Sequence, residues 1–184
     1  EQPTQIGFEL AFGTELIKHR WYGHQKLILE DEGRLIGRCA LPLALQSARG
    51  DADWVQLDAS IEARVQHSYE NYILKNLEEW LLQDATGGFD HFASGLLESL
   101  ARIQKRLGGE RFATLRSTML EALASHERGA PEAHEIWISQ LLTEYYDPMY
   151  EYQMAKRTRP PVFRGTEGEV AEYLMDLAQC AVPD

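Results

Sequence analysis

The sequence predicts an α/β region over residues 1–75 followed by a mainly α-helical bundle over residues 76–184, so the chain is expected to be mostly α overall. Short apolar runs bounded by glycine and charged residues, a pattern typical of strands, occur in the first region. Longer segments with helical spacing of apolar residues, separated by glycine and proline pairs, fill the second. The hydrophobic fraction of 44% and the charged fraction of 26% suit a folded globular chain.

The first region is expected to alternate helices with extended pieces. Pro3–Lys18 is predicted to be a helix with a mostly buried apolar face. The continuous apolar run within Lys26–Glu30 favours a central strand buried on both faces. Arg34–Arg38 favours a second extended piece, and Pro42–Ala48 a short helix that opens with its proline.

The next strand is predicted at Trp54–Leu57, and Asp58 or Ser60 is expected to cap a helix over Ile61–Leu74. Because two short parallel strands cannot form an independent sheet, we expect the strands that flank them to lie upstream of this chain. Val162–Arg164 is predicted to be a last short strand. The helices expected in the second region are Leu77–Leu82, Phe92–Leu107, Glu110–His126, His134–Tyr145 and Glu169–Gln179.

Composition restricts the kind of protein. The two cysteines, Cys39 and Cys180, form no CxxC pair, which argues against a metal site or a disulfide scaffold and suits a cytoplasmic location. No run approaches the roughly 20 apolar residues that span a bilayer, so no membrane partner is expected. The net charge of −11 argues against general nucleic-acid binding, so any RNA contact has to come from local basic clusters.

An apolar run that ends in carboxylates, Leu27–Glu32, is the first candidate site. In P-loop proteins, an acid at the tip of a central strand orients Mg²⁺ beside the nucleotide phosphates. The alternative is a strand that leaves the core into a solvated acidic turn. The chain contains no GxxxxGK[ST] loop, so it lacks a complete phosphate cradle.

Arg64 is the second candidate, because it lies one turn into a helix that follows a strand and an acidic cap. In many nucleotide kinases an arginine at this place faces the phosphates, whose oxygens match its planar fork. The alternative is an exposed arginine that pairs with Glu62 or Asp58. A basic strip of Arg102, Lys105 and Arg106 is explained by favourable interaction with a helix C-terminus.

The segment Tyr145–Arg157 is the most distinctive part of the sequence. Its tyrosines, interleaved with the basic residues that follow, suit unstacked RNA bases and backbone phosphates. Pro148 is expected to stop the helix and to push Asp147 into an extended conformation. The alternative is a tyrosine-rich helix junction that packs on the bundle. The densest positive patch of the chain follows, with Lys156, Arg157, Arg159 and Arg164.

The run YYDPMYEYQMAKR at residues 145–157 resembles the C-terminal signature of bacterial tRNA 2-selenouridine synthases, and its spacing to FRG at residues 163–165 also fits. Three further runs resemble the same family in the same order. They are QPTQIGFE at residues 2–9, LEDEGRLIGRCALP at residues 29–42 and KRLGGERF at residues 105–112. The resemblance therefore spans nearly the whole chain.

This resemblance implies a rhodanese-like domain and a P-loop upstream, with this chain as the distal part of a P-loop NTPase-like domain and its helical tail. The family replaces sulfur by selenium in wobble 2-thiouridine of tRNA, with selenophosphate as donor and a geranylated intermediate made from geranyl diphosphate. Its catalytic cysteine belongs to the rhodanese-like domain, so no catalytic residue is assigned here. No tightly bound cofactor and no metal ligand are expected in this chain. The expected partners are tRNA and those upstream regions.

The resemblance also suggests roles for the candidate residues. Glu30 or Glu32 would orient Mg²⁺ through water, and Arg34 or Arg64 would contact the diphosphate as its charge develops. A helical bundle would supply an apolar groove for the geranyl chain. The residues expected to hold tRNA or to line that groove are Tyr146, Asp147, Tyr150, Lys156, Arg157 and Arg159. Two alternatives remain, an acidic helical protein-interaction module and the distal half of a P-loop small-molecule kinase.

Overall fold

The computed structural model describes residues 2–31 and 33–179. By compactness the chain divides into two units, each described by itself. The first unit contains the residues up to Asp58 together with those from Pro160 onward, and the second contains Ala59–Arg159. The chain is mostly helical, as the sequence predicts. No helix in these described ranges is long and apolar enough to cross a membrane.

The first unit contains two groups of elements. Two helices and two strands lie near the N-terminus, and a smaller group consists of two strands and the C-terminal helix. Its elements are α1 (Gln5–Trp21), β1 (Leu35–Ile36), β2 (Cys39–Ala40), α2 (Leu43–Asp51), β3 (Val55–Leu57), β4 (Phe163–Gly165) and α10 (Glu167–Gln179). Helix α1 begins where the Thr4 hydroxyl accepts a hydrogen bond from the Gly7 amide at 3.2 Å. The predicted helix at Pro3–Lys18 is therefore confirmed, with slightly later bounds, but the mostly buried apolar face expected for it is wrong, because no residue of α1 is buried.

The extended piece predicted at Arg34–Arg38 is also confirmed. It forms β1, which pairs with β2 in an antiparallel hairpin. Gly37 turns the chain with a φ of +60°, a conformation that side chains other than glycine's rarely allow. The Gln2 side chain joins the start of the chain to this turn, because it donates to the Ile36 carbonyl at 2.6 Å and accepts from the Arg38 amide at 3.0 Å.

The strand predicted within Lys26–Glu30 is wrong. These residues have no regular structure, and the side chains of Leu27, Ile28 and Leu29 are between 45% and 55% exposed. An apolar run forms a central strand only where neighbouring strands satisfy its backbone on both sides, and no described segment pairs with this one. A hydrogen bond instead fixes the start of the run, because Nζ of Lys26 donates to the Leu177 carbonyl of α10 at 2.9 Å.

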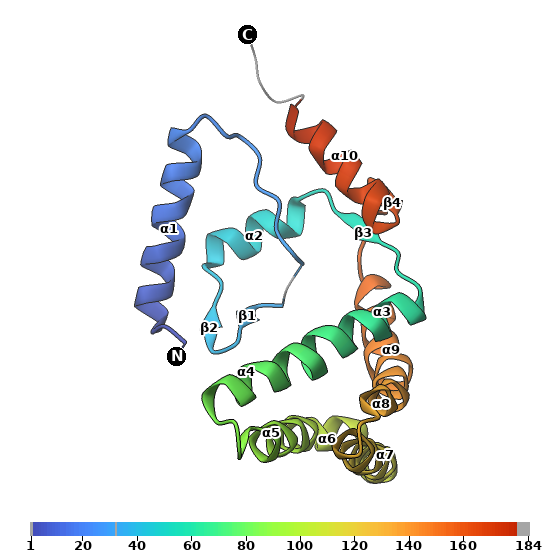
Figure 1. Cartoon of the computed structure of the whole chain (residues 1–184). Helices are drawn as coiled ribbons and strands as arrows, with labels where there is room; N and C mark the ends of the chain where they lie inside the picture. The colour runs from blue at the N-terminus through green and yellow to red at the C-terminus, as the bar shows by residue number, and fades with distance from the viewer. Residues whose placement is uncertain (1, 32, 180–184) are drawn as a thin grey trace. The chain divides into compact units, whose positions relative to one another are not determined.

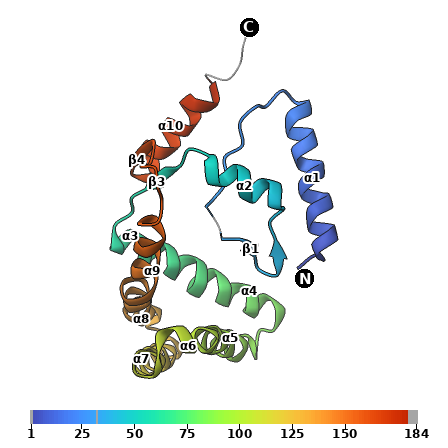
Figure 2. The ribbon, with the colours of Figure 1, turned by 180° about the vertical axis from the view of Figure 1, so that it is seen from behind.

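The strands predicted at Trp54–Leu57 and Val162–Arg164 are confirmed as β3 and β4, and they pair with each other in parallel. They lie side by side in both views of the ribbon (Figures 1 and 2). The pairing is extended by hydrogen bonds from the Val162 amide to the Trp54 carbonyl and from the Asp58 amide to the Gly165 carbonyl. Helix α10 follows directly, with Thr166 and Glu169 forming a capping box at its start.

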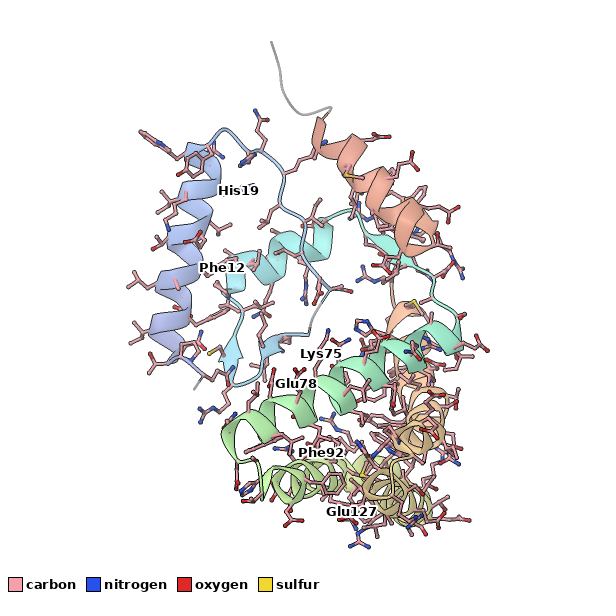
Figure 3. The ribbon with its side chains drawn as sticks, in the orientation of Figure 1. Phe12, His19, Lys75, Glu78, Phe92 and Glu127 are labelled. Carbon is pink, nitrogen blue, oxygen red and sulfur yellow. The ribbon has the colours of Figure 1, made fainter. Side chains whose placement is uncertain are left out.

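The second unit is a helical bundle. Its elements are α3 (Ile61–Ser68), η1 (Tyr69–Lys75), α4 (Asn76–Gln83), α5 (Gly88–Arg102), α6 (Gln104–Leu107), α7 (Gly109–Glu127), η2 (Pro131–Ala133), α8 (His134–Leu141), η3 (Leu142–Tyr146) and α9 (Asp147–Met154). The π-helical turn η1 joins α3 to α4 in one long rod, on which Figure 3 labels Lys75 and Glu78. The helices that the sequence predicts here are confirmed. The domain boundary expected near residue 75 stays a prediction.

The hydrophobic core of the chain belongs to this second unit. Phe92 of α5, Ile73 of η1 and Leu115 of α7 are almost fully buried, and further apolar residues of α3, α6, α7 and α8 pack around them. In the first unit only Cys39 and Leu41 are buried among the described apolar residues, while Ile6, Leu10, Ile17 and Trp21 of α1 are more than 70% exposed. The two units therefore differ sharply in how much apolar surface they bury.

The prediction that Pro148 ends the helix is wrong. Elements α8, η3 and α9 run without a break from His134 to Met154, and Asp147 is helical with φ −59° and ψ −50°. The π turn explains this, because the amide of Asp147 donates to the carbonyl of Leu142, five residues earlier. Pro148 then falls in the first turn of α9, where a missing N–H and a fixed φ are tolerated.

Candidate functional site

Arg64 of α3 and Asp147 of α9 form a two-pronged ion pair in the second unit. Nη1 of Arg64 contacts Oδ1 of Asp147, and Nη2 donates to Oδ2 at 2.9 Å. About a third of each side chain remains exposed, 33% for Arg64 and 28% for Asp147. The hydrogen bond from Arg64 lowers the pKa of Asp147 below its ordinary value. Arg64 thus pairs with neither Glu62 nor Asp58.

Three tyrosines beside this ion pair form a continuous group, here called the tyrosine row: Tyr145, Tyr146 and Tyr150. The ring of Tyr145 meets Tyr146 edge to face at a centroid distance of 5.0 Å. Tyr146 stacks on Tyr150 at 6.3 Å with an interplanar angle of 24°. Burial is the main cause that raises the pKa of Tyr146, whereas Tyr150 is 52% exposed. The row therefore has an anchored inner ring and an outer ring open to a ligand.

Lys156 lies next to a different tyrosine. Its Nζ sits 4.0 Å from the centroid of the Tyr152 ring, a cation–π contact. Residues two apart on a helix differ by about 200° around its axis, so Tyr152 and Tyr150 face nearly opposite directions on α9. Arg157 is half-buried and Arg159 is exposed in the segment that follows. The ammonium of Lys156 is thus not stacked on the tyrosine row.

The other candidates belong to the first unit. Glu30 is exposed in the irregular segment after Lys26, and Glu32 lies outside the described residues. Arg34, next to β1, donates from Nε to the Gln46 side chain at 3.2 Å. Arg64, proposed with them around a diphosphate, belongs to the second unit.

The described residues do not form a magnesium site by themselves. Ion binding by protein carboxylates needs several oxygens converging on one point. Nowhere in residues 2–31 and 33–179 do three or more His, Cys, Asp or Glu side chains come close enough to hold a metal ion. The carboxylate beside Glu30, Asp31, pairs with Arg49 at 3.6 Å. The described carboxylates therefore give no support to the Mg²⁺ role suggested for Glu30. The same role for Glu32 stays a prediction, since that residue lies outside the described residues.

Two residues that sequence reasoning did not assign to a site contact the segment of the tyrosine row. Arg106 of α6 interacts with the Tyr145 side chain, and this interaction raises the pKa of the Arg106 guanidinium. Arg111 of α7 donates from Nη1 to the Glu144 carbonyl at 3.4 Å. A signal was present in the sequence, because both arginines belong to the run KRLGGERF that resembles the family at residues 105–112.

Comparison with known proteins gives the family. The model of the tRNA 2-selenouridine synthase AAA domain matches residues 1–181. The chain belongs to the tRNA 2-selenouridine synthase family. The resemblance drawn from the signature at residues 145–157 is confirmed. The AAA description agrees with the expected nucleotide-binding class, although the P-loop detail of the fold is not confirmed.

Individual members of the tRNA 2-selenouridine synthase family are similar in sequence to this chain along most of its length. The chain is 45% identical over 174 residues to the tRNA 2-selenouridine synthase of Hahella chejuensis, and this alignment covers 94% of the chain and 46% of the relative. It is 42% identical over 175 residues to the tRNA 2-selenouridine synthase of Ectopseudomonas mendocina, where the alignment covers 94% of the chain and 47% of the relative. The chain thus spans about half the length of the curated relatives it matches. No solved structure matches it.

Proposed function

We propose that this chain is the tRNA-binding and prenyl-binding part of a transferase that replaces sulfur by selenium in wobble 2-thiouridine of tRNA through a geranylated intermediate. The observation that carries the proposal is the tyrosine row, which lies within the segment that bears the family signature. Relatives over the whole of this chain are named tRNA 2-selenouridine synthase, which supports tRNA as the substrate.

The tyrosine row suits an unpaired RNA base. Tyr150 is half exposed and rests on Tyr146, which burial holds in place, so a base could stack on Tyr150 without reordering the protein. Stacking on an aromatic side chain contributes about 1–3 kcal/mol per base and tolerates any base, since every base has a π face. Lys156 and Arg157 would neutralise phosphates beyond the row.

Arg34 and Arg64 are both candidates for contacting a diphosphate, but they differ in how many N–H groups remain available. Both Nη atoms of Arg64 already donate to Asp147, so a diphosphate at Arg64 would have to displace this carboxylate. Among the described residues, Arg34 makes one side-chain hydrogen bond, to neutral Gln46, and keeps most of its N–H groups for an anion. We therefore assign Arg64 to holding α9, and we retain Arg34 as a proposed phosphate contact of the first unit, separate from any site in the second unit.

The prenyl group needs an apolar surface, and the rod of η1 and α4 has one. A shallow groove of about 310 Å³ is lined by Leu74, Leu77, Leu81 and Leu82, with Glu78 at its side. A chain of isoprene units would bury apolar area there and gain roughly 25 cal/mol per Å² removed from water. Replacing Leu77 and Leu81 by Ser should weaken the use of geranyl diphosphate more than it weakens tRNA binding.

The selenium transfer itself is not proposed for this chain. Transfer through a protein thiol requires an accessible cysteine. Cys39, the cysteine among the described residues, is buried and donates to the Pro3 carbonyl at 3.5 Å, Cys180 lies outside those residues, and neither matches a rhodanese-like active-site loop. We therefore expect the purified chain, given selenophosphate and thiolated tRNA, to produce no selenouridine.

The test of the proposal uses the full-length protein that contains this chain. Tyr150→Ala should weaken tRNA binding by about 1–3 kcal/mol, whereas Tyr150→Phe, which keeps the ring, should weaken it far less. Lys156→Ala with Arg157→Ala should weaken binding and flatten its dependence on salt. The measurement is tRNA affinity at two salt concentrations together with the melting temperature. Lower melting temperatures with unchanged affinity would show that the tyrosines only pack.

A further inference from the structure

Besides the basic patch at residues 156–164, a second part of this acidic chain carries an excess of positive charge. Residues 99–120 contain five basic residues and one acidic residue, Glu110, although the whole chain has a net charge of −11. This stretch includes the end of α5, all of α6 and the first half of α7. The basic residues are Arg102, Lys105, Arg106, Arg111 and Arg116, and all are exposed. Such separation of charge within one unit provides the local basic surface that RNA binding by an acidic protein requires.

These basic side chains are not neutralised within the protein. Over the described ranges none of them makes an ion pair with a carboxylate. Arg102 donates to the Ser99 hydroxyl and Arg111 donates to the Glu144 carbonyl, while Arg106 interacts with the Tyr145 side chain, so all three partners are uncharged. A guanidinium that makes one neutral contact keeps most of its N–H groups for another acceptor.

Two of these arginines lie at one end of the tyrosine row. Arg106 and Arg111 contact adjacent residues, Tyr145 and Glu144, so their side chains meet at η3. Tyr146 and Tyr150 continue from Tyr145 with centroid distances of 5.0 and 6.3 Å. The ring of Tyr150, at the far end of the row, is 52% exposed and offers a stacking surface to a base that is unstacked from its neighbours. Arg106 and Arg111 thus lie at one end of the tyrosine row, and the exposed ring of Tyr150 forms its other end.

We propose that Arg106 and Arg111 bind backbone phosphates of an unpaired RNA loop while a base of that loop stacks on Tyr150. This inference rests on the proposed function and adds to it the phosphate-binding residues on the side of the tyrosine row. Lys156 cannot serve that side, because its ammonium lies over Tyr152 on the opposite face of α9. The planar guanidinium also matches two phosphate oxygens at once, which an ammonium does not.

The test replaces Arg106 and Arg111 by Gln in the full-length protein and measures binding of a hairpin RNA with an unpaired loop. Affinity should fall roughly tenfold, and the slope of log affinity against log salt should decrease by about 1.4 for two phosphates of a single strand. Arg106→Lys with Arg111→Lys should restore the salt slope but only part of the affinity. Blunt duplex RNA should compete poorly with the hairpin.

Arg128→Gln is the matched control. Arg128 is exposed at the other end of α7, about 25 Å from Arg111 at 1.5 Å per residue, and within residues 2–31 and 33–179 its side chain hydrogen-bonds Ser125 alone. Removing this charge should leave affinity and salt slope unchanged. Equal effects of Arg128→Gln and Arg111→Gln would overturn the inference, because they would show a nonspecific loss of positive charge. Equal competition by duplex RNA would overturn the unpaired loop as ligand.

The inference and the proposed function can fail separately. If Tyr150→Ala weakens hairpin binding while Arg106→Gln with Arg111→Gln does not, the tyrosine row binds RNA and the assignment of the two arginines is wrong. If neither change has an effect on a protein with an unchanged melting temperature, both are wrong.

Discussion

Asp147 receives the guanidinium of Arg64 on both of its carboxylate oxygens, across 83 residues of sequence. The pair joins α3 to α9, the helix that carries the outer tyrosine of the row. Since α9 continues α8 and η3 without a break and has no buried residue of its own, this contact adds a fixed point that ties the start of α9 to α3. Arg64 and Asp147 are therefore expected to act on binding through position and not through contact with a ligand.

Breaking this pair should destabilise the second unit. Asp147→Asn should lower the free energy of unfolding by about 1–2 kcal/mol, between the values typical of exposed and buried pairs, since it leaves the half-buried Arg64 without its counter-ion. Urea unfolding of Arg64→Leu, Asp147→Leu and the double variant gives the coupling energy. Asp58→Asn, at the more exposed pair of Asp58 with Arg164, should cost less than about 1 kcal/mol. Equal losses at both pairs would contradict a special role for Asp147.

Mild acid should destabilise the second unit through a buried histidine. His134 is fully buried, and Nδ1 accepts a hydrogen bond from Trp137 at 2.9 Å, which leaves its proton on Nε2 facing Nδ1 of His126 at 3.2 Å. Burial, with a smaller effect of His126, lowers the pKa of His134 from 6.5 to about 4. The unfolded chain therefore takes up a proton before the folded chain, and stability is lost as pH falls from about 6.5 to about 4.

Denaturant unfolding between pH 7 and pH 4.5 measures this effect. The loss should reach about 2–3 kcal/mol, and His126, whose pKa is also lowered mainly by burial, should add to it. His134→Gln should be less stable at pH 7 but should show a flatter dependence on pH, whereas the exposed His91→Gln should keep the original dependence. A wild-type stability that stays constant over this range would contradict a neutral buried His134.

Gly88 should not tolerate a side chain. A Cβ at this position would lie 2.9 Å from backbone atoms of Trp80 and Leu81, where α5 passes α4. Since backbone cannot yield as a flexible side chain can, Gly88→Ala should cost about 1–3 kcal/mol. Gly95→Ala is the control, because Gly95 lies within the same helix with nothing within 4 Å of its Cβ position, and alanine there should stabilise by up to about 1 kcal/mol. Thermal melts of the two variants should move in opposite directions.

Hydrogen exchange should separate the two units of the isolated chain. Helix α1 has no buried residue and its Trp21 is 84% exposed, so its amides should exchange within the shortest labelling times. Amides of α5 and α7, which surround Phe92 and Leu115, should be the most protected. Protection of α1 equal to that of α7 in the isolated chain would contradict this expectation.

The helices of the second unit could be predicted because helical spacing is a local property of sequence. The pairing of β3 with β4 and of Arg64 with Asp147 could not, since each joins residues that local patterns treat separately. The apolar run at Leu27–Leu29 misled the strand prediction because burial of a strand depends on neighbours, which its own residues do not reveal. Tyr146, Asp147 and Tyr150 were proposed from the tyrosine-rich segment and from its resemblance to the family signature. Arg106 and Arg111 were not assigned to a site because they lie over 30 residues before η3. Interaction with a helix C-terminus accounted for Arg106, and Arg111 lay inside a predicted helix.

The π turn η3 lets the helix from His134 to Met154 contain one residue more than an uninterrupted α-helix between the same two ends. Deleting a single residue from 142–144 should therefore let this turn close as an ordinary α-helical turn, with the direction of α9 and the pairing of Asp147 with Arg64 kept. Inserting a residue there should have a different effect, because the wide turn already holds one extra residue and each further residue rotates an α-helix by about 100°. The alignment of Tyr150 with Arg106 and Arg111 thus tolerates the loss of a residue at η3 better than the gain of one.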